Sequence, residues 1–184
     1  MTVSHQQETV PRVLVLDASN DSGGWQAELG ARMCNVMRRQ GVTVSGPFSA
    51  TAMTEVESLF EGATGSDCAI ILVKSTEEPG PGLSVVDIKD CPAIFDRGTL
   101  KVVAICQCYG SNVWPSIPTL DLPTPRPILI VSSPEMTQRE AALFFPEFFS
   151  ELTNHSQNGI NPAIARFCYA KASRFAPGKA QLFV

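Results

Sequence analysis

Cysteine and histidine are the residue types in this chain best able to supply nucleophilic or metal-ligand chemistry, and their numbers are unequal. The 184 residues include six cysteines but only two histidines, His5 and His155. A cysteine nucleophile needs a base or a positive charge nearby, because a free thiol has a pKa of about 8.5. The one close pair, Cys106 and Cys108, has no second cysteine pair or histidine cluster near it. The ligand spacings of a structural zinc site are therefore missing, and we expect no metal.

The overall composition indicates a folded protein. Hydrophobic residues make up 44% of the chain, charged residues 17%, and the net charge is −4. This excludes general disorder and gives no basic surface for nucleic acid or an anionic membrane. No apolar run reaches about 18 residues, and residues 1–11 are polar and unlike a signal peptide. We therefore expect a cytoplasmic protein with reduced thiols, no membrane association and no nucleic-acid partner.

Short, branched apolar runs alternate with helical patterns along the chain. This alternation predicts an α/β fold in three layers, with a mostly parallel sheet of five to six strands and helices on both faces. We expect a flexible tail over 1–11 and a single domain over 12–184. The expected strands cover 12–17, 42–44, 68–73, 100–106 and 128–131, with 181–184 as the sixth.

Polar side chains that can cap a helix mark where several helices begin. The longest helix has two alternative starts: Ser133–Pro134, or Thr137 with Glu140 in a capping box one turn later. Asn161–Pro162 predicts the start of the last helix. Ser84 with Asp87 offers a capping box for a short helix that Pro92 interrupts. Four phenylalanines in the longest helix have helical spacing and are expected to be core: Phe144, Phe145, Phe148 and Phe149.

Ligands of an open parallel sheet bind at the carboxyl ends of its strands, which selects four loops. These loops begin at residues 17, 74, 108 and 132. In the third of them a thiol, Cys108, precedes Tyr109 and Gly110, so backbone N–H groups beside it could stabilise an oxyanion. The alternative is that Cys108 is the last packed residue of its strand, since free cysteine is so often buried.

Residues 101–110, KVVAICQCYG, resemble the nucleophile strand of caspase-like cysteine peptidases. In that pattern a hydrophobic strand leads to the catalytic cysteine, one further residue and a glycine. The resemblance implies Cys108 as the nucleophile; a shifted frame would select Cys106 but lose Gly110. Residues 127–131 and 140–149 resemble the penultimate strand and Phe-rich helix of CHAT domains, which are relatives of caspases, and 161–165 resemble the helix that follows. The resemblance implies a caspase-like fold over most of 13–184.

The catalytic histidine of that family follows the third strand, and Ser75 stands at its position here. Neither histidine of the chain is a credible replacement. His5 lies in the tail, and His155 follows a helix of roughly 20 residues, about 30 Å long, that leads away from the site. Lys74 could lower the pKa of a nearby thiol, but it is a poor general acid for an amine leaving group.

Three functions follow from these residues. The first is a CHAT- or caspase-like domain that has lost its catalytic pair and acts, alone or in a homo- or hetero-oligomer, as a regulatory module binding a protein or peptide. The second is an active cysteine peptidase using Cys108 and an unidentified base. The third is a flavodoxin-like protein that binds FMN or a nucleotide, because 18–24 resemble a flavodoxin phosphate loop. We expect the first, with no cofactor. The pocket residues expected around Cys108 are Tyr109, Gly110, Ser19, Asn20 and Ser132.

Overall fold

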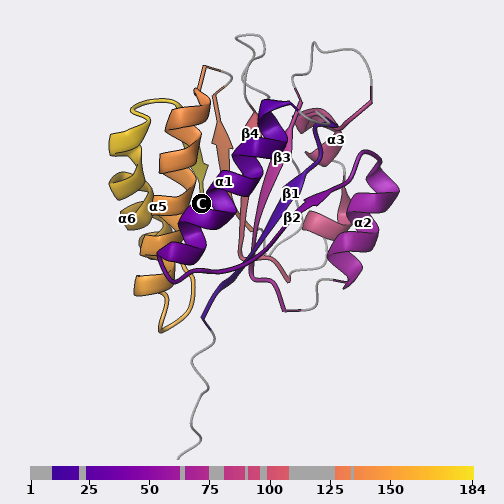
Figure 1. The fold of residues 1–184 in the computed structure, drawn as a ribbon. Helices are drawn as coiled ribbons and strands as arrows, with labels where there is room; N and C mark the ends of the chain where they lie inside the picture. Colours follow the sequence, from indigo (N-terminus) through magenta and orange to yellow (C-terminus); the bar gives the residue numbers. More distant parts are fainter. Residues whose placement is uncertain are drawn as a thin grey trace, which may run out of the picture.

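The fold was obtained as a computed structural model (Figure 1), which describes residues 10–20, 24–62, 65–74, 81–89, 91–95, 99–107, 127–133 and 135–184. Its sheet has six strands in the order β2-β1-β3-β4-β5-β6. The first five are parallel, and β6 is antiparallel to β5. The strands are β1 (Arg12–Asp17), β2 (Thr43–Ser49), β3 (Cys68–Val73), β4 (Val102–Gln107), β5 (Ile128–Ser132) and β6 (Ala180–Phe183). The predicted α/β class is confirmed.

Helices cover both faces of the sheet and bury two hydrophobic clusters. One cluster joins the sheet to α1 (Trp25–Arg39), α5 (Gln138–His155) and α6 (Pro162–Ala172). The other joins it to α2 (Met53–Gly62), α3 (Val85–Lys89) and α4 (Pro92–Phe95). Successive strand residues point to opposite faces of the sheet. Because helices cover both faces, every residue of β3 and β4 is buried. This explains why the central strands are almost continuous apolar runs. A short 3-10 helix, η2 (Ser173–Phe175), follows α6.

Strand boundaries agree with the sequence predictions for β1 and β3, differ by one or two residues for β4, β5 and β6, and differ most at the outer strand β2. Both β1 and β3 have the predicted bounds, but β2 continues to Ser49 rather than ending at Val44. Gly46 and Pro47 look like turn residues in the sequence. They are tolerated in β2 because it is an outer strand with a neighbour on one side only. The N–H that proline lacks is then not needed for hydrogen bonds to a second neighbouring strand. The predicted tail lies almost entirely outside the described residues.

The helix-capping predictions are confirmed, and one alternative is resolved. The longest helix, α5, begins at Gln138: the Thr137 hydroxyl accepts from the N–H of Glu140, and the Glu140 carboxylate accepts from the N–H of Thr137. Asn161 caps α6 by accepting from two backbone N–H groups. Ser84 and Asp87 bond reciprocally at the start of α3. The four phenylalanines Phe144, Phe145, Phe148 and Phe149 are fully buried, as predicted.

Replacing Thr137 by alanine is expected to lower the free energy of unfolding by about 1 kcal/mol, because α5 loses its N-cap. Urea denaturation followed by circular dichroism measures the change. Thr54→Ala is the matched control, since Thr54 is an exposed threonine in the first turn of α2. An effect of Thr137→Ala no larger than that of the control would contradict the capping role.

Candidate functional site

The carboxyl ends of the parallel strands meet at one edge of the sheet, and β3 and β4 are neighbours there. Val73 and Gln107 are paired in register at the last position of both strands. Lys74 and Cys108 are the next residues of the chain, so the two segments expected to carry the site start from adjacent strand ends. The sheet thus places side by side the strand ends from which the two selected loops start.

The loop after β1 is closed by a buried carboxylate. Asp17 is 5% exposed, and its Oδ1 accepts from the backbone N–H of Ser19 at 3.0 Å and from the Ser19 hydroxyl. Asn20 follows in the left-handed backbone region, with φ of 58°. Asp17 therefore already accepts from the N–H and hydroxyl of Ser19, two groups that a phosphate in this loop could otherwise accept from. A phosphate would also meet a negative charge, which disfavours an anion site.

Residues 81–84 form a short strap that ties the end of β1 to the end of β3. The N–H of Leu83 donates to Ala18 O at 2.6 Å, and the N–H of Lys74 donates to Leu83 O at 3.0 Å. Gly82 has φ of +103°, and a Cβ there would lie 2.2 Å from Ser19 O. Only glycine allows this approach of two backbones. From the sequence alone these residues belonged only to the loop that begins at residue 74, and Gly82 was the one sequence signal of the close contact.

Lys74 is half-buried and acts electrostatically on a carboxylate of α3. Burial raises the pKa of Asp87, but hydrogen bonds from Ser84, together with the positive charge of Lys74, lower it below its ordinary value. Asp87 is therefore ionised at neutral pH and faces the Lys74 ammonium. A lysine ammonium beside an ionised carboxylate stabilises a nearby thiolate less than a lysine ammonium without such a neighbour would.

Ser132 holds the end of β4 from the neighbouring strand. Its buried hydroxyl accepts from the N–H of Gln107 and donates to Gln107 O, both at 2.8 Å. Backbone pairing between β4 and β5 ends at Ile105 and Val131, so this side chain continues the ladder by one step. Ser132 was predicted as a pocket residue, and the structure places its hydroxyl on the strand end. The side-chain Oε1 of Gln107 is buried without a hydrogen-bond partner among the described residues.

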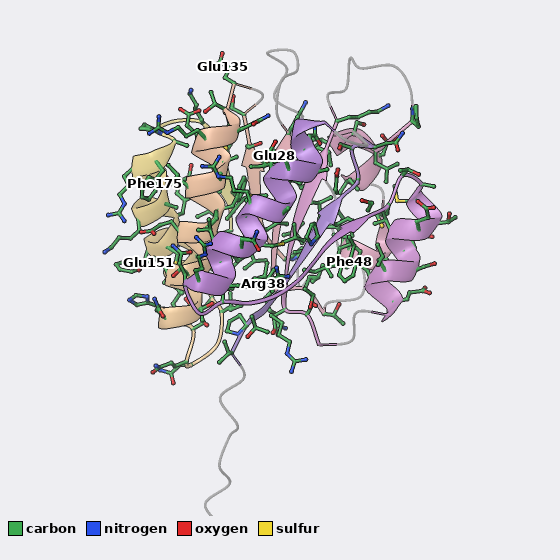
Figure 2. All side chains as sticks on the ribbon, viewed as in Figure 1. Glu28, Arg38, Phe48, Glu135, Glu151 and Phe175 are labelled. Atoms are coloured by element: carbon green, nitrogen blue, oxygen red, sulfur yellow. The ribbon has the colours of Figure 1, made fainter. Side chains whose placement is uncertain are left out.

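His155 lies far from this edge. Its Nδ1 is 2.9 Å from Glu151 O, and its ring centroid is 4.9 Å from that of Phe167 on α6. The 18 residues of α5 span about 27 Å, and His155 is the last of them. Figure 2 shows Glu135, just before α5, at the carboxyl edge and Glu151 toward the opposite end. His5 lies outside the described residues.

All five cysteines that the structure describes are buried: Cys34, Cys68, Cys91, Cys106 and Cys168. Burial raises the pKa of Cys34 and Cys68 above the ordinary value. Burial, aided by the negative charge of Glu151, raises the pKa of Cys168 to about 11. These thiols are poor nucleophiles at neutral pH because almost none of each is thiolate. The predicted site residues Ser75, Cys108, Tyr109 and Gly110 lie outside the described residues.

The described part of the chain holds neither a metal-ligand cluster nor a helix that could span a membrane. No group of three or more histidine, cysteine or acidic side chains is placed to hold a metal ion. Among the helices described, none combines the length and apolar character needed to cross a bilayer.

The strand order defines the class of fold. Five parallel strands in the order 2-1-3-4-5 are the arrangement of flavodoxin-like doubly wound folds, and here an antiparallel sixth strand is added. No protein-family model matches the chain, and no curated protein does so significantly. Among solved structures, the chain is similar to the crystal structure of a flavodoxin-like domain from Synechococcus sp.. That match has a TM-score of 0.38 and 14% sequence identity, covering 89% of this chain and 94% of that one. The resemblance to CHAT domains stays a prediction.

Proposed function

We propose that this chain is a non-catalytic protein-binding module of caspase-like type, with Cys108 at the position of a nucleophile and no base beside it. One observation carries the proposal: His155 is held by Glu151 and Phe167 at the far end of α5. The chain has only one other histidine, His5, and Ser75 occupies the position after β3 where the family has its own. A thiol without an imidazole lacks the proton acceptor and donor of peptide cleavage.

The arrangement of the strand ends supports the caspase-like part of the proposal. In the family the histidine and cysteine follow the third and fourth strands, and Val73 and Gln107 end those strands side by side here. The position of Lys74 supports the loss of catalysis. Its charge faces Asp87, so it is a weak substitute for an imidazolium in stabilising a thiolate.

Thiol labelling of the native protein tests the proposal. Five thiols are buried and protected, so we expect iodoacetamide to label Cys108 faster than the other cysteines, with the labelled residue identified by mass spectrometry. Without a base, its rate should rise with pH around the ordinary thiol pKa of about 8.5 and show no plateau at lower pH. Cys108→Ser is the control that removes the fast-labelled site.

An active peptidase would give a different result in the same experiment. Its labelling rate would already reach a plateau below about pH 7, because a paired thiolate is ionised there. A peptide carrying a cysteine-directed warhead would also label Cys108 rapidly in the native protein and not after denaturation. Either result would overturn the proposal in favour of the peptidase. Slow warhead labelling that is equal in native and denatured protein would support it.

A further inference from the structure

A shallow hollow of about 440 Å³ opens between the end of the outer strand β2 and helix α2. Phe48 is 40% exposed at this place, and Figure 2 shows it between the two elements. Leu59 adds a second apolar side chain, and the remaining lining is polar. The hollow is lined by Phe48, Ser49, Thr54, Glu55, Ser58 and Leu59. An exposed aromatic ring at a hollow with a polar rim is typical of a contact surface.

The segment that contains this hollow has a net negative charge, and one of its carboxylates, Glu55, lines the hollow itself. Residues 43–68 contain four acidic residues and no lysine or arginine. The whole chain has 18 acidic and 14 basic residues, so the other residues carry 14 of each and the net charge of −4 belongs to this segment. Hydrogen bonds from the N–H groups of Thr51 and Ala52 lower the pKa of Glu55, so its carboxylate is ionised at neutral pH. The four acidic residues are Glu55, Glu57, Glu61 and Asp67.

The last part of the chain has the opposite character. Residues 156–184 contain four basic residues and no aspartate or glutamate. Arg174 is paired with Glu147 and Lys179 with Glu140, both on α5. Arg166 and Lys171 are exposed on α6 and form no ion pair with the described residues.

An exposed aromatic ring lies between these two cations. Phe167 is 45% exposed, with the Nζ of Lys171 5.5 Å from its ring centroid. The His155 ring packs against it from α5. The α6 face thus presents an apolar side chain flanked by positive charge. The β2–α2 hollow presents two apolar side chains, Phe48 and Leu59, together with the carboxylate of Glu55.

We propose that the α6 face of one copy of this chain docks into the β2–α2 hollow of a second copy. Phe167 would enter the hollow against Phe48 and Leu59, and Arg166 and Lys171 would face the carboxylates of α2. The two surfaces lie on opposite sides of the molecule (Figure 1), so the α6 face of one copy cannot contact the hollow of the same copy. Because the contact joins two different patches, each added copy leaves one patch of each kind open, and short open chains form.

The contact is weak and sensitive to salt. Its charges lie at exposed positions, where screening reduces the attraction as ionic strength rises. A contact built around one aromatic ring is smaller than the roughly 1,200 Å² that stable interfaces bury, so we expect weak association. Neither surface contains a residue of the candidate site, so the inference does not depend on the proposed function.

Sedimentation velocity with charge reversals on each surface tests the inference. The full chain is compared at about 10 to 300 µM, in low and high salt. We expect the unaltered protein to associate at low salt and to dissociate at high salt. Glu57→Lys with Glu61→Lys, or Arg166→Glu with Lys171→Glu, should each keep the protein monomeric. An equal mixture of the two double variants should associate again, because each reversed surface meets its opposite.

Further variants separate surface effects from misfolding and from net charge. Arg32→Glu with Arg139→Glu reverses two exposed cations outside both surfaces and should leave association unchanged. Phe167→Ser, at an exposed position, should weaken association at least fivefold while keeping the melting temperature. Three results would overturn the inference: a monomer at the highest concentration in low salt, association unchanged by either reversal, or no recovery on mixing variants that keep the melting temperature of the unaltered protein.

Discussion

Replacing Phe144 by alanine is expected to lower the free energy of unfolding by about 3 to 5 kcal/mol. The Phe144 ring is completely buried and meets Phe145 and Tyr169 edge-to-face, with centroid distances of 5.1 and 5.9 Å. Its removal loses the transfer free energy of the ring and leaves a cavity that α5 and α6 cannot fully close. The residual stability would be small, because domains are stable by only about 5 to 15 kcal/mol in total.

The preceding residue provides a matched control for this substitution. Leu143 lies in the same helix but is 41% exposed, so Leu143→Ala should cost less than about 1 kcal/mol. Urea denaturation of both variants measures the two costs. Equal costs, or a loss below about 1.5 kcal/mol for Phe144→Ala, would show that the core around α5 and α6 is less closely packed than the structure has it.

Substitution of Gly46 by alanine is expected to cost about 3 kcal/mol or more. Gly46 has φ of +105°, and a Cβ there would lie 2.4 Å from Val15 O and 3.0 Å from the backbone N of Phe48. The contact is with the backbone of the neighbouring strand, so no side-chain rotation relieves it. β1 and β2 would have to separate locally at the point where their register shifts.

Gly41→Ala separates the steric part of that cost from the conformational part. Gly41 also has a positive φ, +82°, but a Cβ there would meet nothing within 4 Å. Its replacement should cost about 1 kcal/mol, which is the price of the left-handed backbone for an L-residue. Thermal denaturation of both variants gives the difference. If the two variants have the same melting temperature, the close approach of β1 and β2 at Gly46 is not a constraint on the fold.

The fold was largely predictable because its signals are local. The buried strands β1 and β3 read as branched apolar runs, and their side chains fill both faces of the sheet. The sequence allowed two alternative starts for α5, and the hydrogen bonds between Thr137 and Glu140 in the structure decide between them. The length of β2 was missed because an outer strand needs few apolar residues. Its Gly46 and Pro47 therefore indicate a turn to a reader of the sequence.

The candidate site was predictable in place but not in its supporting contacts. Strand ends alone located the edge where β3 and β4 finish together. The partners of the site residues are distant in sequence: Ser132 reaches Gln107 across 25 residues. The contact of Gly82 with Ser19 likewise depends on how two loops meet. Such pairs leave no periodic signal in a single sequence.

The hydroxyl of Ser132 has a consequence for motion at the end of β4. A strand end held by backbone pairing can detach only if the two strands separate. Gln107 is held at its N–H and C=O by one hydroxyl group, and that group sits on a single rotatable bond. Rotation about χ1 of Ser132 would release both bonds at once and leave the pairing of Ile105 with Val131 intact. The residue that leads into Cys108 would then be held only on its other side, by its pairing with Val73 of β3.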